Sequence, residues 1–130
     1  MTLEDAREFF AQDRYATKAT GIVIDEIKEG YSRVSLELKD HHKAAGDHVM
    51  GGVFYTIADF SFAVATNTPE HLTVTTNGNI SYYSQPKDDR LIAECKVQKE
   101  GKRFCFYEST VSDGLGNTVA KVTFNGAHIS

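Results

Sequence analysis

Val53-Phe54-Tyr55-Thr56-Ile57-Ala58-Asp59-Phe60-Ser61-Phe62-Ala63-Val64-Ala65 is the segment that decides the fold of this chain. Apolar residues occur on every side of a helix drawn through it, which is typical of a helix that protein encloses on most of its circumference. Asp59 lies at the midpoint. A carboxylate there loses hydration unless it is hydrogen-bonded, paired or open to water, and an unpaired buried charge usually becomes protonated. The segment therefore predicts a buried central helix with one acidic side chain that needs an explanation.

Alternation of apolar and polar residues predicts strands on both sides of this helix. Before it, residues 22–38 alternate around a Glu29-Gly30 turn, as the two strands of a half-buried antiparallel hairpin do. After it come four further strand candidates, separated by short turns: residues 72–83, 91–98, 103–112 and 118–128.

A short amphipathic helix is predicted at the N-terminus. Thr2 has the character of a helix N-cap with Asp5 as its acidic partner, and apolar residues continue at helical spacing to about Asp13. The whole order is helix, two strands, long helix and four strands, without a repeat or a linker. It predicts one α+β domain over residues 1–130, in which an antiparallel sheet wraps around a single long helix.

Composition and charge disfavour several classes of protein. The net charge is −4 and there is no block of Lys and Arg, which disfavours nucleic-acid binding. The N-terminus lacks a basic region followed by an apolar core, and no apolar stretch is long enough to span a bilayer. We therefore expect a cytoplasmic protein without a membrane span. Cys95 and Cys105 flank one predicted turn, but cytosolic disulfides are rare, so we expect two free thiols.

Two interpretations of Asp59 are open at this point. In the first, its carboxylate only accepts a hydrogen bond, from Thr56 or from the covering sheet. In the second, it lines a crevice where partial desolvation keeps it basic enough to activate water or to attack a carbonyl carbon. Gly51-Gly52 favours the second, because the free N–H groups of a first helical turn can stabilise a negatively charged oxygen. The pair is also compatible with a plain loop before a helix.

The spacing between Gly51 and Asp59 adds a geometric constraint. Eight residues of helix correspond to roughly 12 Å along the axis. One carbonyl group cannot lie within about 3 Å of both. If the two groups serve one reaction, the carboxylate must come from a second copy of the helix, most simply related to the first by a twofold axis. We therefore expect a homo-oligomer, with dimer and tetramer both open.

Several motifs together resemble one known family. The segment 51–59 resembles the His-Gly-Gly-x-x-x-x-Leu-Ala-Asp segment of hotdog-fold thioesterases of the phenylacetate-pathway type. Residues 79–86 are similar to the strand of that family that ends in a Pro turn, and the segments 91–94, 100–103 and 113–120 follow in the same order and spacing. The resemblance covers roughly residues 15–128.

The resemblance implies a fold, an activity and a set of site residues. It implies hydrolysis of an acyl-CoA thioester in a hotdog fold, with CoA as part of the substrate and no separate cofactor. By this resemblance, the N–H of Gly51 polarises the thioester carbonyl, and Asp59 of the neighbouring subunit is the general base or the nucleophile. Thr75, on the following strand, corresponds to the hydroxyl residue that helps to place the water.

The glycine loop departs from the family pattern. Met50 stands where the family usually has His, and Lys43 stands where it has Asn, with one extra residue near His48. We expect Met50, His48 and Gly52 to line the substrate site. The departures also leave an alternative function, a non-catalytic hotdog protein that binds acyl-CoA or another small ligand.

Two further expectations concern charged and metal-binding side chains. Lys102 and Arg103 lie at a predicted turn and are candidates for contacts with CoA phosphates. His41, His42 and His48 have no Cys, Asp or Glu at ligand-like spacing, so we expect no metal.

Overall fold

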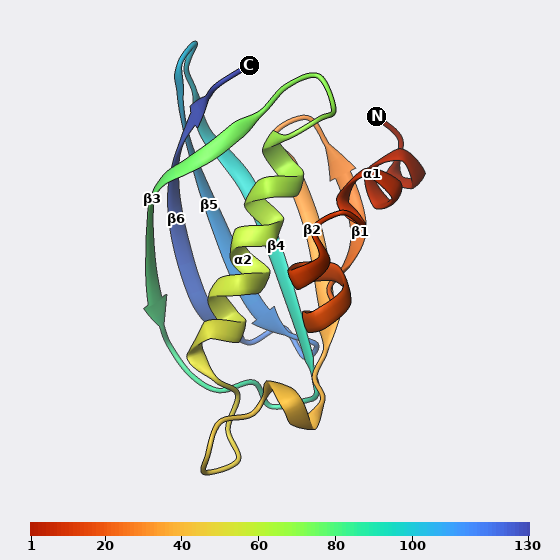
Figure 1. Cartoon of the computed structure of the whole chain (residues 1–130). Coiled ribbons are helices and arrows are strands. Elements are labelled where there is room, and N and C mark those ends of the chain that lie inside the picture. Colours follow the sequence, from red (N-terminus) through yellow and green to blue (C-terminus); the bar gives the residue numbers. More distant parts are fainter.

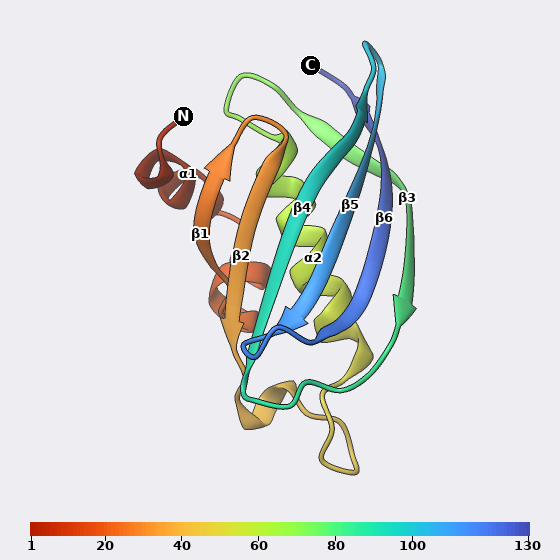
Figure 2. The same cartoon turned by 180° about the vertical axis from the view of Figure 1, so that it is seen from behind.

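One antiparallel sheet wraps around helix α2 (Gly51–Thr66) in the computed structural model, which describes residues 1–130 (Figure 1). In sheet order, the six strands are β1 (Val23–Lys28), β2 (Tyr31–Glu37), β4 (Arg90–Glu100), β5 (Phe104–Asp113), β6 (Thr118–His128) and β3 (Thr73–Tyr82). Seen from behind, the outer face of the sheet carries no helix (Figure 2). This is the hotdog fold, and the α+β architecture expected from the sequence is confirmed.

The N-terminal segment covers the side of α2 next to β1. Helix α1 (Leu3–Phe10) begins with the predicted capping box, in which Thr2 and Asp5 each accept the other's main-chain N–H at 3.1 Å. The Arg7 guanidinium donates two hydrogen bonds to the Ile24 carbonyl and so fixes α1 to β1. A π-helix, Tyr15–Thr20, follows and was not predicted; it ends at Gly21, whose φ is +95°.

Buried hydroxyl groups fix α2 against the sheet. The Ser61 hydroxyl donates to the Ala58 carbonyl at 2.6 Å and lies 2.7 Å from the Ser109 hydroxyl on β5. The Ser32 hydroxyl on β2 donates to the Ser61 carbonyl at 2.6 Å. Each buried polar group therefore has a partner, which an apolar core requires. These contacts set the position of the helix along its axis, and with it the positions of Gly51 and Asp59.

One face of α2 lies outside the core. Phe54, Ile57 and Ser61 point into the core and are buried, whereas Gly52 and Asp59 are exposed. The prediction that the helix is enclosed on most sides is confirmed, and Asp59 lies on the side that a single chain leaves exposed. The sheet does not cover this side of the helix, and the N-terminal segment borders Asp59 without covering it.

Strand β3 is an edge of the sheet, and most of it is exposed. It pairs only with β6, and residues 74–79 are all exposed. Its ten residues include no charged side chain and no proline. Long uncharged edge strands offer unpaired main-chain groups to another strand. The edge at β3 is therefore a candidate surface for pairing with a second chain.

Cys95 and Cys105 are free thiols, as expected; the strand register places them opposite Ser109 and Glu100. None of the helices combines the length and apolar character that crossing a bilayer requires.

Candidate active site

Asp59 lies in a hollow between α2 and the N-terminal segment. The hollow has a volume of about 370 Å³, and α2, the π-helix and the turn before it form its walls. Besides Asp59, it is lined by Asp13, Arg14, Tyr15, Ala16, Tyr55, Thr56, Phe60 and Ala63. A carboxylate thus faces a partly apolar space large enough for a small group or several waters.

The Asp59 carboxylate has no partner within its own chain. Thr56, one turn earlier, donates its hydroxyl hydrogen to the Gly52 carbonyl at 2.8 Å and is not available to Asp59. Arg14 lines the same hollow but makes no ion pair with Asp59. Although Asp59 is exposed, the surrounding protein removes part of its hydration and so raises the pKa of its carboxyl, and the negative charge of Asp13 raises it further. The first interpretation of Asp59 included a hydrogen bond from Thr56, and the structure does not contain that bond.

The helix start offers two unpaired donors. Met50 is the N-cap of α2 and provides no side-chain cap, and the N–H groups of Gly51 and Gly52 donate no hydrogen bond within the chain. The dipole of a sixteen-residue helix adds partial positive charge at this end. An oxyanion placed here would receive hydrogen bonds that the chain itself leaves unused.

Two side chains from the end of β3 and the following loop hold the glycine pair in place. The Gln85 amide accepts from the Val49 N–H at 2.7 Å and donates to the Val49 carbonyl at 3.2 Å. The Tyr82 hydroxyl donates to the Gly51 carbonyl at 3.3 Å. The sequence motifs did not assign a role to either side chain. The Gln-Pro pair just beyond the end of β3 was the only available signal, and it lies far along the chain from the glycine pair.

The loop before α2, which departs from the family pattern, places His48 beside Gly51 and pairs Lys43 within the loop. His48 shares a hollow of about 340 Å³ with Gly51 and the tyrosines at the end of β3. Met50 is 58% exposed and does not line this hollow. Lys43 forms an ion pair with Asp47 within the loop, at 3.7 Å. The structure thus brings His48 close to Gly51, whereas Asp59 lies in the other hollow.

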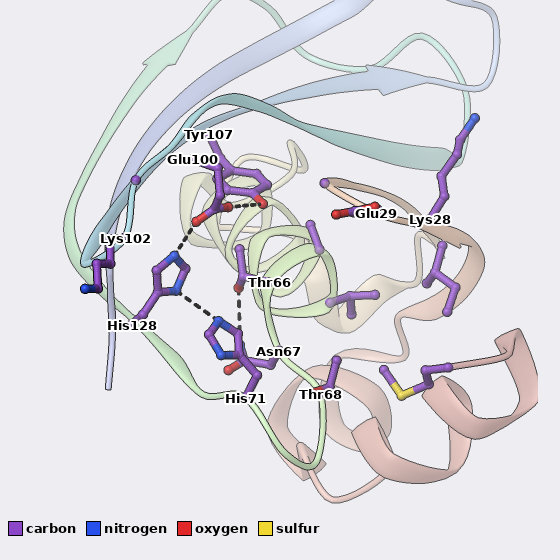
Figure 3. A pocket seen from close by; sticks show the side chains of 16 residues that line it. Lys28, Glu29, Thr66, Asn67, Thr68, His71, Glu100, Lys102, Tyr107 and His128 are labelled. Atoms are coloured by element: carbon purple, nitrogen blue, oxygen red, sulfur yellow. Dashed lines mark hydrogen bonds and ion pairs between the residues drawn. The ribbon is translucent and has the colours of Figure 1, made fainter. Parts of the chain in front are cut away.

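The other predicted residues lie away from Asp59 in a single chain. Thr75 is exposed on β3 opposite Gly126, and no hydrogen bond joins it to Asp59. Arg103 is exposed in the β4–β5 turn. Lys102, beside it, lines a hollow of about 570 Å³ at the C-terminal end of α2 (Figure 3). A helix of sixteen residues is about 24 Å long, so this turn is far from Gly51 of the same chain.

The model of the thioesterase superfamily matches residues 46–120, which include the whole of α2 and the strands from β3 to β5. This chain belongs to the thioesterase superfamily. Two archaeal relatives are predicted esterases. The Archaeoglobus fulgidus protein is 29% identical over 73% of this chain and 62% of its own length. The Saccharolobus solfataricus protein is 27% identical over 78% of this chain and 69% of its own length.

Solved structures of two other proteins share the fold. The Escherichia coli PaaI protein from the phenylacetic acid degradation operon has a TM-score of 0.85 and 23% identity, over 99% of this chain and 97% of its own. A hypothetical thioesterase from Streptococcus pneumoniae, solved with coenzyme A, has a TM-score of 0.84 and 17% identity, over 93% and 97% of the two chains.

Proposed function

We propose that this member of the superfamily hydrolyses acyl-CoA thioesters at sites that two copies of the chain build together. The observation that carries the proposal is the unpartnered Asp59 carboxylate on the uncovered face of α2, with its pKa raised. A partly desolvated carboxylate is costly in a structural role and useful as a base or nucleophile. The thioesterase family and the predicted esterases among its relatives support a hydrolytic role.

The chemistry divides between two chains. The Gly51 N–H of one chain donates a hydrogen bond to the thioester oxygen as it becomes negatively charged. Asp59 of the other chain takes a proton from water, which attacks the carbonyl carbon, or attacks that carbon itself to form an anhydride that water then opens. The C–S bond breaks, and the CoA sulfur leaves as thiolate and is protonated. Thr75 is proposed to orient the water.

Separate hollows for Gly51 and Asp59 support the need for two chains. Within one chain the glycine lies with His48 and Tyr82, and the aspartate lies with residues of the π-helix. Eight residues of α2 separate the two groups. A twofold axis that placed two α2 helices side by side would bring each Asp59 toward the other chain's Gly51.

The uncharged edge of β3 supports the same assembly. Pairing of β3 with its copy would continue the six-stranded sheet into a second subunit and satisfy the outward main-chain groups of residues 73–82. Coenzyme A in the Streptococcus pneumoniae thioesterase supports CoA as the carrier for this chain. In this proposal Met50, Gly52 and His48 contact the substrate, and Lys102 and Arg103 contact the CoA phosphates.

Replacement of Asp59 tests the catalytic assignment. Asp59→Asn keeps the size of the side chain and removes the base, and we expect thiol release from a panel of short, long and aromatic acyl-CoAs to fall at least about a hundredfold. Asp25→Asn is the matched control, because Asp25 lies on β1 in a hollow that Asp59 does not line. Unchanged turnover in purified Asp59→Asn would refute the assignment.

The alternative function is non-catalytic binding of acyl-CoA or another small ligand. The departures from the family pattern in the loop before α2 support it. Met50 offers no hydrogen bond at the N-cap, and Lys43 pairs within the loop. If the wild type is inactive, gain of hydrolysis in Met50→His would favour this alternative. An active wild type would exclude it.

A further inference from the structure

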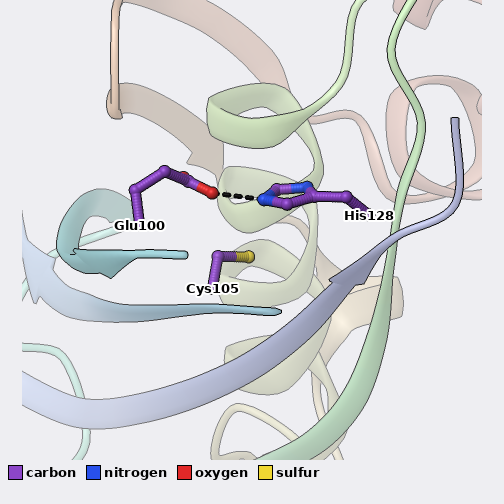
Figure 4. Close-up of side chains that lie close together, drawn as sticks. All are labelled: Glu100, Cys105 and His128. Carbon is purple, nitrogen blue, oxygen red and sulfur yellow. Dashed lines mark hydrogen bonds and ion pairs between the residues drawn. The ribbon is translucent and has the colours of Figure 1, made fainter. Parts of the chain in front are cut away.

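Four side chains with metal-binding or hydrogen-bonding groups meet at the C-terminal end of α2, away from Asp59. Glu100, Cys105 and His128 come from the end of β4, the start of β5 and the end of β6, and Figure 4 shows them converging. One ligand atom from each, a carboxylate oxygen, the thiol sulfur and an imidazole nitrogen, lie within 4.8 Å of one another. His71 lies beside them, with its Nε2 3.2 Å from Nδ1 of His128.

The three atoms lie near one another, but their separations are not yet those of a bound metal ion. Zinc bonds of about 2.0–2.3 Å in a tetrahedral site place the ligand atoms roughly 3.3–3.8 Å apart. Nε2 of His128 already contacts the Glu100 carboxylate, and the Cys105 sulfur lies below them. Closure around an ion requires the ligand atoms to move by about 1 Å, a range that side-chain rotation covers.

Outer hydrogen bonds hold two of the three ligands in a binding orientation. His128 is held through Nδ1, which lies 2.7 Å from the Thr73 hydroxyl, so that Nε2 points at Glu100. Glu100 is held through its second oxygen, which accepts from the Tyr107 hydroxyl at 3.0 Å. Protein metal sites commonly fix the remote atom of each ligand in this way.

The exposure of the three side chains increases from Cys105 through His128 to Glu100. Cys105 is fully buried, the His128 side chain is 11% exposed, and the Glu100 side chain is 47% exposed. Glu100 and His128 also line the hollow of about 570 Å³ in Figure 3. An ion can enter from this hollow, and water can complete its coordination from the same side.

We propose that Glu100, Cys105 and His128 bind a divalent transition-metal ion of the zinc class, with the fourth position open to the hollow. The set of one sulfur, one imidazole nitrogen and one carboxylate oxygen suits Zn²⁺ or Co²⁺ and does not suit Mg²⁺ or Ca²⁺. Binding displaces the thiol proton of Cys105 to solvent and replaces the contact between Glu100 and His128 with two metal bonds. The ion ties β6 to the β4–β5 hairpin.

This proposal departs from the sequence expectation of no metal. That expectation rested on His41, His42 and His48 in one loop, whereas the cluster draws its ligands from three separate strand ends. Burial, together with the Glu100 charge, raises the pKa of the Cys105 thiol to about 11, so the free thiol is not a nucleophile at neutral pH. The cluster lies at the opposite end of α2 from Gly51, and its test is independent of hydrolysis.

Titration of the chelator-treated full-length protein with Co²⁺ tests the proposal. A cobalt–thiolate bond gives a charge-transfer absorption, and we expect this band with wild type, with one Co²⁺ per chain, and its loss on addition of Zn²⁺. Cys105→Ser should abolish the band. Cys95→Ser is the matched control, because Cys95 is also a buried thiol but lies opposite Ser109, outside the cluster, and it should keep the band.

A second variant keeps the test decisive if Cys105→Ser does not fold. Glu100→Gln changes a half-exposed side chain at the rim, and we expect it to weaken Co²⁺ binding at least about tenfold while the circular-dichroism spectrum stays the same. Absence of the band in wild type would overturn the proposal and leave a simple hydrogen bond between His128 and Glu100. A band that persists in Cys105→Ser, or undiminished affinity in Glu100→Gln, would also overturn it.

Discussion

At Asp59, a carboxylate without a hydrogen-bond partner lies midway along an otherwise apolar helix. Loss of hydration raises its pKa, and Asp13 across the hollow adds to the shift. When folding raises the pKa of a carboxyl group, the folded state is less stable with the group charged than with the group neutral. The position is therefore explained by function better than by stability.

Removal of the Asp59 charge is expected to stabilise the protein at neutral pH. Because the folded pKa is raised, the charged carboxyl lowers the free energy of unfolding at pH values above that pKa, and the cost disappears as the pH falls through it. Asp59→Asn should therefore melt at a higher temperature than wild type at pH 7, and the two should converge in acid. Thermal denaturation at several pH values measures this. A lower melting temperature for the variant at pH 7 would contradict an unpartnered charge.

Asp13 should tune the pH dependence of turnover. The base form of Asp59 exists only above its pKa, so kcat/KM falls as the pH falls through that value. Asp13→Asn removes a negative charge that raises the Asp59 pKa, and the acid limb of the profile should move to lower pH. Glu8→Gln on α1 is the control, because Glu8 lies outside the hollow. An acid limb that stays in place would show that Asp59 is not the group that titrates.

At the scale of elements, the sequence pattern predicts nearly all of the helices and strands. The period-two runs become β1 to β6, and the capping pair at Thr2 starts α1 where it was expected. The π-helix Tyr15–Thr20 was missed, because a single wide turn has no hydrophobic period of its own. The sequence did not show which side of α2 the sheet leaves uncovered, because apolar residues occur on all sides of the helix.

The site was only partly predictable for a related reason. Gly51 and Asp59 stand out because one segment contains both. Gln85 and Tyr82 position the glycine pair from 31 or more residues away, and the Glu100–Cys105–His128 cluster joins three strand ends. Contacts between distant segments depend on the order of the strands in the sheet, which local patterns do not encode.

Gly126 lies where β5, β6 and α2 pack closely, so we expect an added side chain there to lower the free energy of unfolding. A Cβ at Gly126 would lie 2.8 Å from Phe62 and 3.0 Å from Cys105 and Thr73. Gly126→Ala should therefore lower the free energy of unfolding by about 1–3 kcal/mol, measured by urea denaturation. Thr123→Ala, exposed on the same strand, should change it by less than about 0.5 kcal/mol. Equal stability of the two variants would mean that the core accommodates the added methyl group.

At the scale of the whole molecule, the bare face of α2 and the uncharged edge at β3 are two open surfaces of one chain. Pairing of two copies through β3 would cover both surfaces and continue the sheet. Nothing in the sequence pattern of β3 distinguishes an edge from a central strand, so the prediction of a second copy came from the distance between Gly51 and Asp59 and from the family resemblance, not from β3.

A charge placed on the β3 edge should separate the subunits. Asn77 lies near the middle of β3, where the twofold axis of the proposed dimer would bring each strand against its copy. Asn77→Lys should weaken the dimer at least about tenfold, because like charges would meet, and turnover should fall with it. Thr123→Lys, on the interior strand β6, should leave both unchanged. Analytical ultracentrifugation measures the association. A fully active monomeric Asn77→Lys variant would exclude a shared site.

Complementation between two inactive variants is the most direct test of a site built by two chains. Gly51→Pro removes the proposed N–H donor at the first position of α2, where proline is tolerated, and Met50 before it already has an extended backbone. Gly51→Ala retains the N–H, with its Cβ at an ordinary contact distance from Tyr82, and serves as the control.

In a mixed dimer of Asp59→Asn and Gly51→Pro, one of the two sites combines an intact Gly51 with an intact Asp59. Random mixing of the two chains by co-expression or refolding should restore about a quarter of wild-type thiol release, although each variant alone is inactive. If both residues act within one chain, the mixture will stay as inactive as its components, and the shared site that we propose would be wrong.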